Sequence, residues 1–187
     1  CCSSYAWNRS SKRDSEDGPM NKFLTALLVC IAFVSTTQAG QTKGLFTAEE
    51  RPEMWCLAQN VYYEARGSNL ADRMAVADVV LNRVSHNYYP NTICGVVQQG
   101  KQYASGSMIR NMCQFSWYCD GKSDWPTDIN AWVEAQQIAY NILVFGDIRG
   151  ITEGATHYHA NYVEPAWAKD FALVGRIGVH IFYRWEN

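Results

Sequence analysis

The apolar and polar positions follow a helical pattern in the first half of the chain. Over residues 53–65, apolar side chains recur at intervals of three and four residues, as on one face of a helix, and Gly67 is placed to end it. Ser68 or Asn69 can cap the next helix. Residues 71–84 are rich in Ala, Val and Leu on more than one face. We therefore predict two successive helices, the second of them centrally buried.

The pattern changes twice in the second half. Residues 87–121 contain several glycines and polar stretches, which predict loops and short strands. Residues 128–145 are again helical in period, and Gly146 follows as a stop. Residues 156–160 and 179–184 alternate as strands do. The predicted order is helices, an irregular stretch, a helix and then strands. This order indicates a single α+β domain that is mainly helical.

Composition and charge exclude several classes of protein. Apolar residues make up 48% and charged residues 18%, as in globular proteins rather than disordered ones. The 16 basic and 18 acidic residues give a formal charge of -2, which excludes a strongly basic nucleic-acid binder. No apolar run approaches the roughly 20 residues of a bilayer-spanning helix, so a polytopic membrane protein is excluded.

The first methionine, Met20, begins a pattern typical of a secretory signal peptide. Lys22 supplies the positive charge, residues 23–34 form a short apolar run, and the small residues before Gly40 form a cleavage site. We expect cleavage after Ala39, export to the periplasm or cell envelope, and no stable membrane insertion afterwards. The competing hypothesis is an uncleaved membrane anchor. The expected divisions are 1–19 as an extraneous upstream segment, 20–39 as the signal peptide, 40–52 as a linker and 53–187 as the catalytic domain.

Four cysteines remain after the expected cleavage: Cys56, Cys94, Cys113 and Cys119. An even number in an exported chain predicts two disulfides, and four cysteines allow three pairings. A zinc site is the alternative, but the closely spaced ligand pairs of such sites are missing.

Glu64 is the first candidate for chemistry. It lies beside Leu57 and Val61 at the edge of the apolar helical face, and in the last turn of that helix. Partial burial and the negative end of the helix dipole both raise the pKa of a carboxyl group. Such a group stays protonated near neutral pH and can donate a proton. The alternative is a salt bridge to a nearby arginine, such as Arg66, Arg73 or Arg83.

Residues 113–121 combine hydrogen-bonding side chains with flat aromatic ones. This mixture suits a carbohydrate groove, although composition alone favours a disulfide-closed loop whose aromatic side chains only pack. Asp120 is either a second carboxylate for catalysis or a turn residue before Gly121.

His157 and His159 share one face of a predicted strand and could bind a metal ion together. The sequence offers no third ligand at a recognisable spacing, and His180 is close only if the two terminal strands pair. We prefer a polar strand face that lines a cleft, with no metal.

Several short motifs occur in one order across the predicted domain, and together they resemble the SleB-type cell wall hydrolases. The matching stretches are residues 63–67, 75–77, 80–84, 89–97, 113–117, 155–159 and 178–183. The resemblance implies a lysozyme-like fold, no cofactor, and cleavage of peptidoglycan glycan strands between N-acetylmuramic acid and N-acetylglucosamine. It places the catalytic glutamate at Glu64. It also implies substrate contacts from Gln114, Phe115, Ser116, Tyr158 and His159.

Two reactions fit this resemblance. A muramidase normally needs two carboxyl groups, whereas a lytic transglycosylase needs one. Asp72 and Asp78 lie on a helix expected to be buried, and Asp120 lies at a turn, so we expect a transglycosylase, in wall remodelling or phage lysis. Less favoured alternatives are a zinc amidase that uses His157 and His159, and a non-catalytic glycan-binding module.

Overall fold

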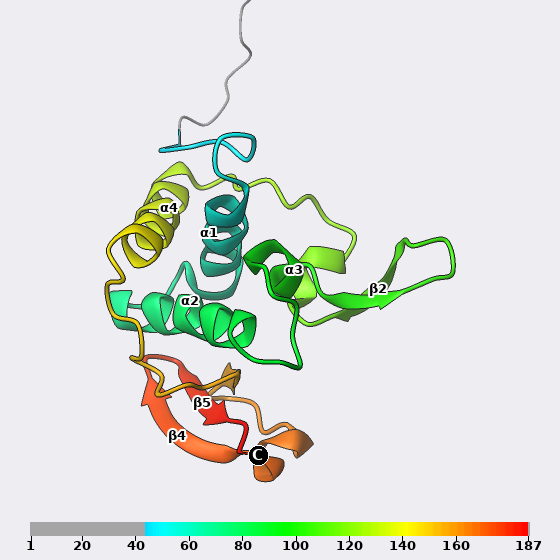
Figure 1. Ribbon diagram of the computed structural model, residues 1–187, viewed down its shortest axis with the longest axis vertical. Coiled ribbons are helices and arrows are strands. Elements are labelled where there is room, and N and C mark those ends of the chain that lie inside the picture. Colours follow the sequence, from blue (N-terminus) through cyan, green and yellow to red (C-terminus); the bar gives the residue numbers. More distant parts are fainter. Residues whose placement is uncertain (1–43, 187) are drawn as a thin grey trace, which may run out of the picture. The chain divides into compact units, whose positions relative to one another are not determined.

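The computed structural model describes residues 44–186, which form one mixed α and β unit (Figure 1). The expected signal peptide and the segment before it lie outside the described residues. Within residues 44–186, no helix is both long and apolar enough to cross a membrane.

Three long helices form the larger part of the unit. They are α1 (Pro52–Ala65), α2 (Leu70–Val84) and α4 (Ile129–Val144), close to the predicted ranges. Asn69 caps α2 and Asp128 caps α4, each accepting a hydrogen bond from a backbone N–H of the first turn. Gly146 follows α4 with a φ of 72°, a conformation that glycine adopts without strain.

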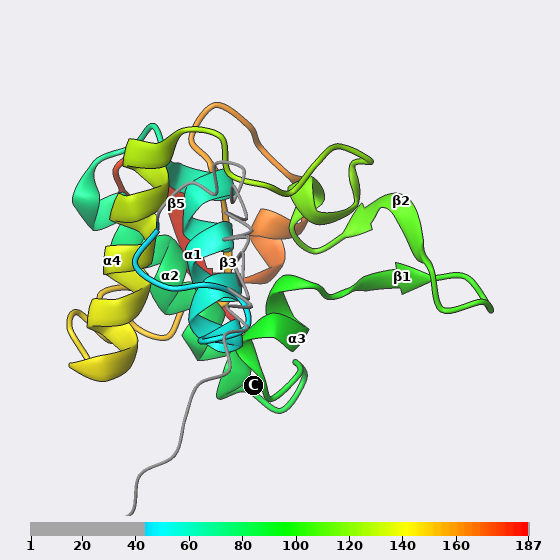
Figure 2. The ribbon, with the colours of Figure 1, turned by 90° about the horizontal axis from the view of Figure 1, so that it is seen from above.

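The irregular stretch contains more regular structure than its composition predicts. It forms α3 (Ile93–Val97), β1 (Gly100–Gln102), β2 (Met108–Cys113) and a short 3₁₀ helix, η1 (Ser116–Cys119). The strands β1 and β2 pair into an antiparallel hairpin that projects away from the helices (Figure 2). The helix α3 has only five residues, too few for its period to stand out in the sequence.

A three-stranded antiparallel sheet ends the chain, in the order β3-β5-β4. The predicted strands correspond to β3 (His157–Ala160) and β5 (His180–Arg184). A second 3₁₀ helix, η2 (Ala166–Asp170), and the unpredicted strand β4 (Ala172–Ile177) lie between them in sequence. Tyr158 pairs with Phe182, so both side chains lie on the same face of the sheet.

The helix α2 lies between the other helices and the sheet (Figure 1). Ala77 and Val80 belong to the main core with α1 and α4, whereas Ala75 and Val79 pack with Phe182 of the sheet. Burial on both sides explains why this helix is apolar around most of its circumference.

The segment before α1 differs from the expected linker, because the described part of it is packed against the helices. Phe46 is in the main core, and its carbonyl accepts a 2.7 Å hydrogen bond from the buried Gln136 amide of α4. The Oε1 atom of Gln136 accepts a 2.6 Å hydrogen bond from the Leu45 N–H. Residues 44–51 are therefore part of the folded unit.

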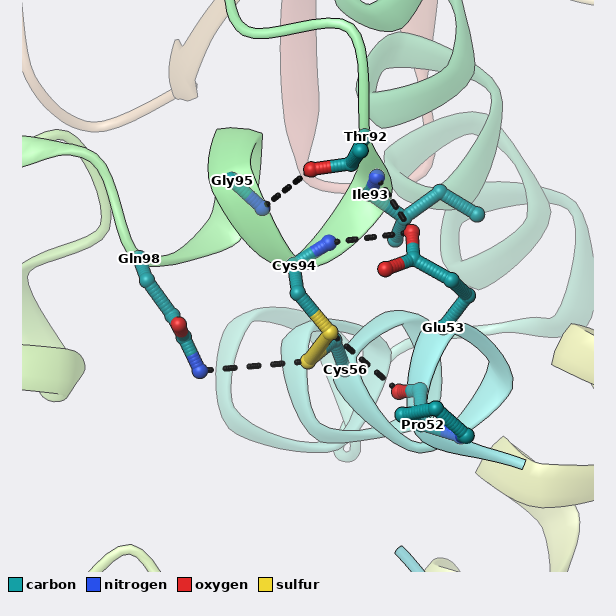
Figure 3. Close-up of a disulfide and its surroundings, with 8 residues drawn as sticks. All are labelled: Pro52, Glu53, Cys56, Thr92, Ile93, Cys94, Gly95 and Gln98. Atoms are coloured by element: carbon teal, nitrogen blue, oxygen red, sulfur yellow. Dashed lines mark hydrogen bonds between the residues drawn. A yellow bond between two sulfur atoms is a disulfide. The ribbon is translucent and has the colours of Figure 1, made fainter. Parts of the chain in front are cut away.

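Both predicted disulfides form, as Cys56–Cys94 and Cys113–Cys119. The first joins α1 to α3 (Figure 3). Beside it, a Glu53 carboxylate oxygen accepts hydrogen bonds from the N–H groups of Ile93 and Cys94, at 2.6 and 3.3 Å. A carboxylate at these free N–H groups stabilises the start of so short a helix. The second disulfide closes the base of the projecting hairpin onto η1.

We expect the two disulfides to differ in their effect on stability. Cys56–Cys94 spans 38 residues and Cys113–Cys119 only six. Loop-closure entropy then predicts a loss of about 4 kcal/mol for the Cys56→Ser/Cys94→Ser variant, and about 2 kcal/mol for Cys113→Ser/Cys119→Ser. Urea unfolding of both variants measures the difference. A larger loss from the short loop would contradict the entropic account.

Candidate active site

Glu64 lies in the last turn of α1 and contacts the sheet. The hydroxyl of Tyr158, on β3, donates a 3.1 Å hydrogen bond to its Oε2 atom. The two residues are 94 positions apart in sequence, so folding alone brings them together. Because Oε2 is occupied by this bond, Oε1 is the oxygen left to carry a proton toward a substrate.

The surroundings of Glu64 favour its protonated form. Burial raises the pKa of this carboxyl group. The hydrogen bond from Tyr158 and the charges of His180 and Arg83 act in the opposite direction without cancelling the effect of burial. The direction of this shift agrees with the expectation drawn from partial burial at the edge of the apolar helical face.

Tyr158 itself stays neutral. Burial and the neighbouring Glu64 carboxyl raise the pKa of its phenol well above the ordinary value. Its hydroxyl is therefore a permanent hydrogen-bond donor to Glu64. The predicted substrate residue Tyr158 thus orients the candidate acid, a role that its motif alone did not indicate.

A buried hydrogen-bonded pair, His180 and Asp72, lies behind Tyr158. His180 Nδ1 donates a 2.8 Å hydrogen bond to Oδ1 of Asp72, and the Val179 N–H donates to Oδ2 at 3.2 Å. The rings of His180 and Tyr158 meet edge to face, with centroids 5.1 Å apart. Burial alone would raise the pKa of Asp72, but the bonds from His180 and Val179 outweigh it and lower the pKa.

The turn before β5 has no space for a larger residue. A Cβ atom at Gly178 would lie 2.6 Å from Asp72, and this glycine has a φ of 58°. From the sequence, His180 is indicated only as a possible metal ligand. Its role follows from the pairing of β3 with β5, which places His180 and Tyr158 on the same face of the sheet.

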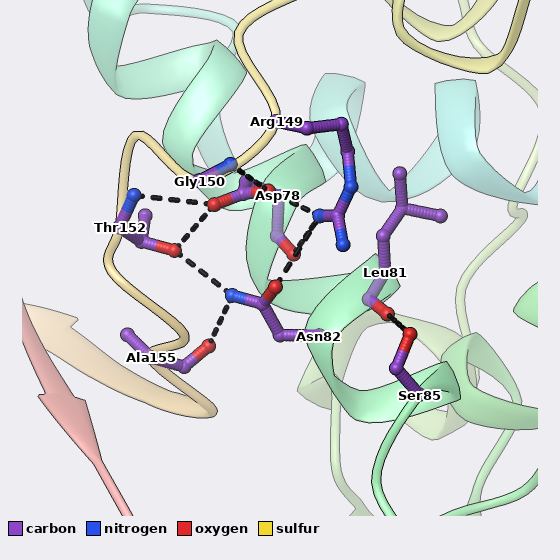
Figure 4. A network of polar contacts seen from close by, with 8 residues as sticks. All are labelled: Asp78, Leu81, Asn82, Ser85, Arg149, Gly150, Thr152 and Ala155. Atoms are coloured by element: carbon purple, nitrogen blue, oxygen red, sulfur yellow. Dashed lines mark hydrogen bonds and ion pairs between the residues drawn. The ribbon is translucent and has the colours of Figure 1, made fainter. Parts of the chain in front are cut away.

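A second polar network fixes the loop that leads into β3 (Figure 4). Asp78, fully buried in α2, accepts hydrogen bonds from the N–H of Gly150 at 3.1 Å and from both the N–H and the hydroxyl of Thr152, at 3.1 and 2.6 Å. It also forms an ion pair with Arg149. Asn82 donates to the Ala155 carbonyl at 2.9 Å. Asp78 is thereby fully engaged in structure.

His157 and His159 lie on the opposite face of the sheet from Tyr158. The His157 ring packs against Phe171, with centroids 4.0 Å apart, and burial, followed by the charges of Arg83 and His86, lowers its pKa to about 4. His159 Nε2 lies 3.0 Å from the Tyr183 hydroxyl. Among residues 44–186, no group of three His, Cys, Asp or Glu side chains is arranged to hold a metal ion.

The run after β2 separates into exposed and buried side chains. Gln114 and Ser116 are exposed, whereas Phe115 is only 3% exposed and lies in the main core. Its ring faces the Arg83 guanidinium, 5.1 Å from the ring centroid. Phe115 therefore packs as scaffold, and the prediction that it contacts substrate does not fit its burial.

Trp117 and Asp120 also have structural contacts. Trp117 stacks on Tyr63 of α1, with centroids 4.6 Å apart. The Asp120 carboxylate accepts a 2.8 Å hydrogen bond from the Lys122 N–H, as in a turn. This contact agrees with the alternative in which Asp120 is a turn residue before Gly121.

A family model described as cell wall hydrolase matches residues 67–183, well over half of the chain. The chain belongs to the cell wall hydrolase family. Glu64 lies just before the matched stretch. The spore cortex-lytic enzyme of Bacillus subtilis (strain 168) is 46% identical over 41 residues, which cover 22% of this chain and 13% of that enzyme.

Two solved structures share the fold. The catalytic domain of the germination-specific lytic transglycosylase SleB from Bacillus anthracis aligns with a TM-score of 0.53 and 24% identity, over 76% of this chain and 99% of that domain. The catalytic domain of the Bacillus cereus SleB protein gives 0.50 and 22%, over 79% and 99%. These matches confirm the predicted fold class and the resemblance to the SleB-type enzymes.

The raised pKa of Glu64 predicts a pH-dependent gain in stability for Glu64→Gln. The stability that protonated Glu64 contributes is fully present below its unfolded-state pKa and is lost as the pH rises through the higher folded-state pKa. Glutamine cannot ionise, so the variant should match the natural protein at about pH 4 and exceed it at about pH 8.

Urea unfolding at both pH values measures this difference. Glu49→Gln is the matched control, because Glu49 is exposed. An equal effect of Glu64→Gln at the two pH values would contradict the pKa assignment.

Proposed function

We propose that this member of the cell wall hydrolase family is an exported peptidoglycan glycosidase, with Glu64 as its single catalytic acid and base. The bond cleaved joins N-acetylmuramic acid to N-acetylglucosamine in the glycan strands. The observation that carries the proposal is a desolvated carboxyl group of raised pKa, oriented by the neutral Tyr158 hydroxyl. A general acid needs this combination of a retained proton and a fixed direction.

The proposed reaction is that of a lytic transglycosylase. Glu64 donates its proton to the glycosidic oxygen, the bond from that oxygen to C1 of the muramoyl residue breaks, and the N-acetylglucosamine leaves with a new hydroxyl group. The Glu64 carboxylate then takes the proton of the muramoyl 6-hydroxyl. The freed oxygen bonds to C1, closing a 1,6-anhydro ring and returning Glu64 to its protonated form. The intramolecular attack gains from proximity.

The other carboxylates favour this reaction over hydrolysis by a muramidase. Retaining and inverting hydrolases normally use a second carboxyl group, either as nucleophile or to activate water. Asp72 and Asp78 are fully buried and occupied by their partners, and Asp120 caps a turn. The engagement of these three carboxylates supports a reaction in which Glu64 acts alone, as a transglycosylase allows.

A zinc amidase is the weaker alternative. It would need His157, His159 and a third ligand on one face, but His180 lies on the other face of the sheet and is bonded to Asp72. Of the proposed substrate contacts, Gln114 and Ser116 are exposed, so they stay candidates. His159 is a candidate only for a substrate that reaches the face of the sheet opposite Tyr158.

We place the enzyme in the periplasm or cell envelope, after cleavage of a signal peptide over residues 20–39. Its partners are glycan strands and not nucleic acid, and the proposed reaction needs no cofactor. The setting is wall remodelling or phage lysis.

Mass spectrometry of the products from purified peptidoglycan tests the reaction. We expect 1,6-anhydromuramoyl ends, which are lighter than hydrolysed ends by one water. Glu64→Gln should lower the rate by at least about 10²-fold, because it keeps the hydrogen bond from Tyr158 but cannot deliver a proton. Reducing muramic acid ends as the main product would identify a muramidase, and full activity of Glu64→Gln would refute the role of Glu64.

Asp120→Asn distinguishes the two reactions independently. The amide oxygen can still accept the hydrogen bond from Lys122, so the turn should survive. As a transglycosylase, the variant should keep most of its activity. Its inactivation in a folded protein would point to a second catalytic carboxylate.

A further inference from the structure

Arg83 is a buried cation without an acidic partner. It lies in the last turn of α2 and is 5% exposed. The arginines at positions 73, 149 and 184 form ion pairs with Glu134, Asp78 and Glu186. Among residues 44–186, no carboxylate forms an ion pair with Arg83. Buried charges are ordinarily paired, so an unpaired one calls for a physical explanation.

Neutral groups hold the guanidinium in place. Its Nε–H donates a 2.7 Å hydrogen bond to the Thr156 carbonyl. The rings of Tyr89 and Phe115 lie 5.3 and 5.1 Å from its central carbon, as in cation–π contacts. Nη1 is buried without a hydrogen-bond partner among the described residues. These contacts fix the position of the charge but leave it uncompensated.

The charge is fixed close to Glu64. Arg83 donates to the carbonyl of Thr156, the residue just before β3, and Tyr158, two residues further along the chain, binds Glu64. The guanidinium and the carboxyl group are therefore both held by the short segment 156–158, and the charge of Arg83 acts on Glu64. The charge of a Glu64 carboxylate in turn acts on this guanidinium.

We propose that Arg83 is a positioning residue for Glu64, a fixed buried charge that stabilises the carboxylate formed when Glu64 gives up its proton. This inference rests on the proposed function. Burial on its own disfavours the carboxylate form of Glu64. A group that acts first as an acid and then as a base within one turnover has to reach both its protonated and its ionised form. Burial lowers the pKa of Arg83, but an arginine side chain still keeps its charge across the neutral range.

The other ionisable groups around this carboxyl do not provide a lasting unpaired positive charge. His180 is bonded to the Asp72 carboxylate, Tyr158 is neutral, and His157, with a pKa of about 4, is neutral at pH 7. Arg83 is therefore the one unpaired permanent charge among these neighbours. The groups that face either Glu64 or Arg83 are Tyr158 of β3, His180 of β5 with Asp72 of α2, Tyr89 after α2, and His157 of β3.

Three substitutions of Arg83 test the proposal. Arg83→Met removes the charge but keeps an apolar chain between the two rings, Arg83→Gln removes it with a polar chain, and Arg83→Lys keeps it. The readout is the pH dependence of kcat/KM for cell wall solubilisation. Its alkaline limb reports the loss of the Glu64 proton in the free enzyme.

We expect the alkaline limb to move upward by about one pH unit in the two neutral variants, because removing a nearby cation raises the pKa of a carboxyl group. Arg83→Lys should keep the limb of the natural protein. Active neutral variants with an unmoved limb would overturn the proposal. A raised KM with unchanged kcat and limb would instead assign Arg83 to substrate binding.

Circular dichroism of each variant accompanies the assay. Failure of both neutral variants to fold would assign the charge to the fold and also overturn the proposal. The natural protein, assayed alongside, separates this inference from the proposed function. Absence of glycan cleavage there refutes the function, whereas unmoved limbs in active variants refute only the role of Arg83.

Discussion

The attachment of the sheet to α2 is the constraint on which the candidate site depends. Asp72 accepts a hydrogen bond from the turn between β4 and β5, and Asp78 accepts hydrogen bonds from the loop before β3. Arg83 donates to the Thr156 carbonyl, at the end of that loop. A buried carboxylate that loses its hydrogen-bond donors lowers the stability of the folded protein. These contacts therefore favour one position of the sheet on α2. That arrangement puts the Tyr158 hydroxyl on Glu64.

The carboxylates of α2 have structural roles, unlike Glu64 of α1. Asp72 and Asp78 are saturated with hydrogen-bond partners, and those of Asp72 lower its pKa. Within the described part of the chain, the Glu64 side chain has one hydrogen bond, from a neutral phenol, and burial raises its pKa. The difference in environment, rather than any difference in residue type, leaves Glu64 as the group suited to proton transfer.

Local patterns in the sequence predicted the long helices, both disulfides and the unusual position of Glu64. These features depend on period, cysteine number and place in a helix, which neighbouring residues determine. The strand β4 was missed because its alternation is interrupted at Gly175, where the register shifts. Phe115 was assigned to the substrate through the family motif, and membership of a motif does not separate residues that contact glycan from residues of the scaffold. The Asp72–His180 pair spans 108 positions and depends on strand pairing, which no local pattern shows.

The central claim is that folding holds a proton on Glu64. Carbon-13 NMR of the glutamate side-chain carboxyl groups measures this directly, with the Glu64 signal assigned by its disappearance in Glu64→Gln. Our account predicts that this signal titrates at a higher pH than those of exposed glutamates such as Glu49. A Glu64 midpoint at or below that of the exposed glutamates would contradict it.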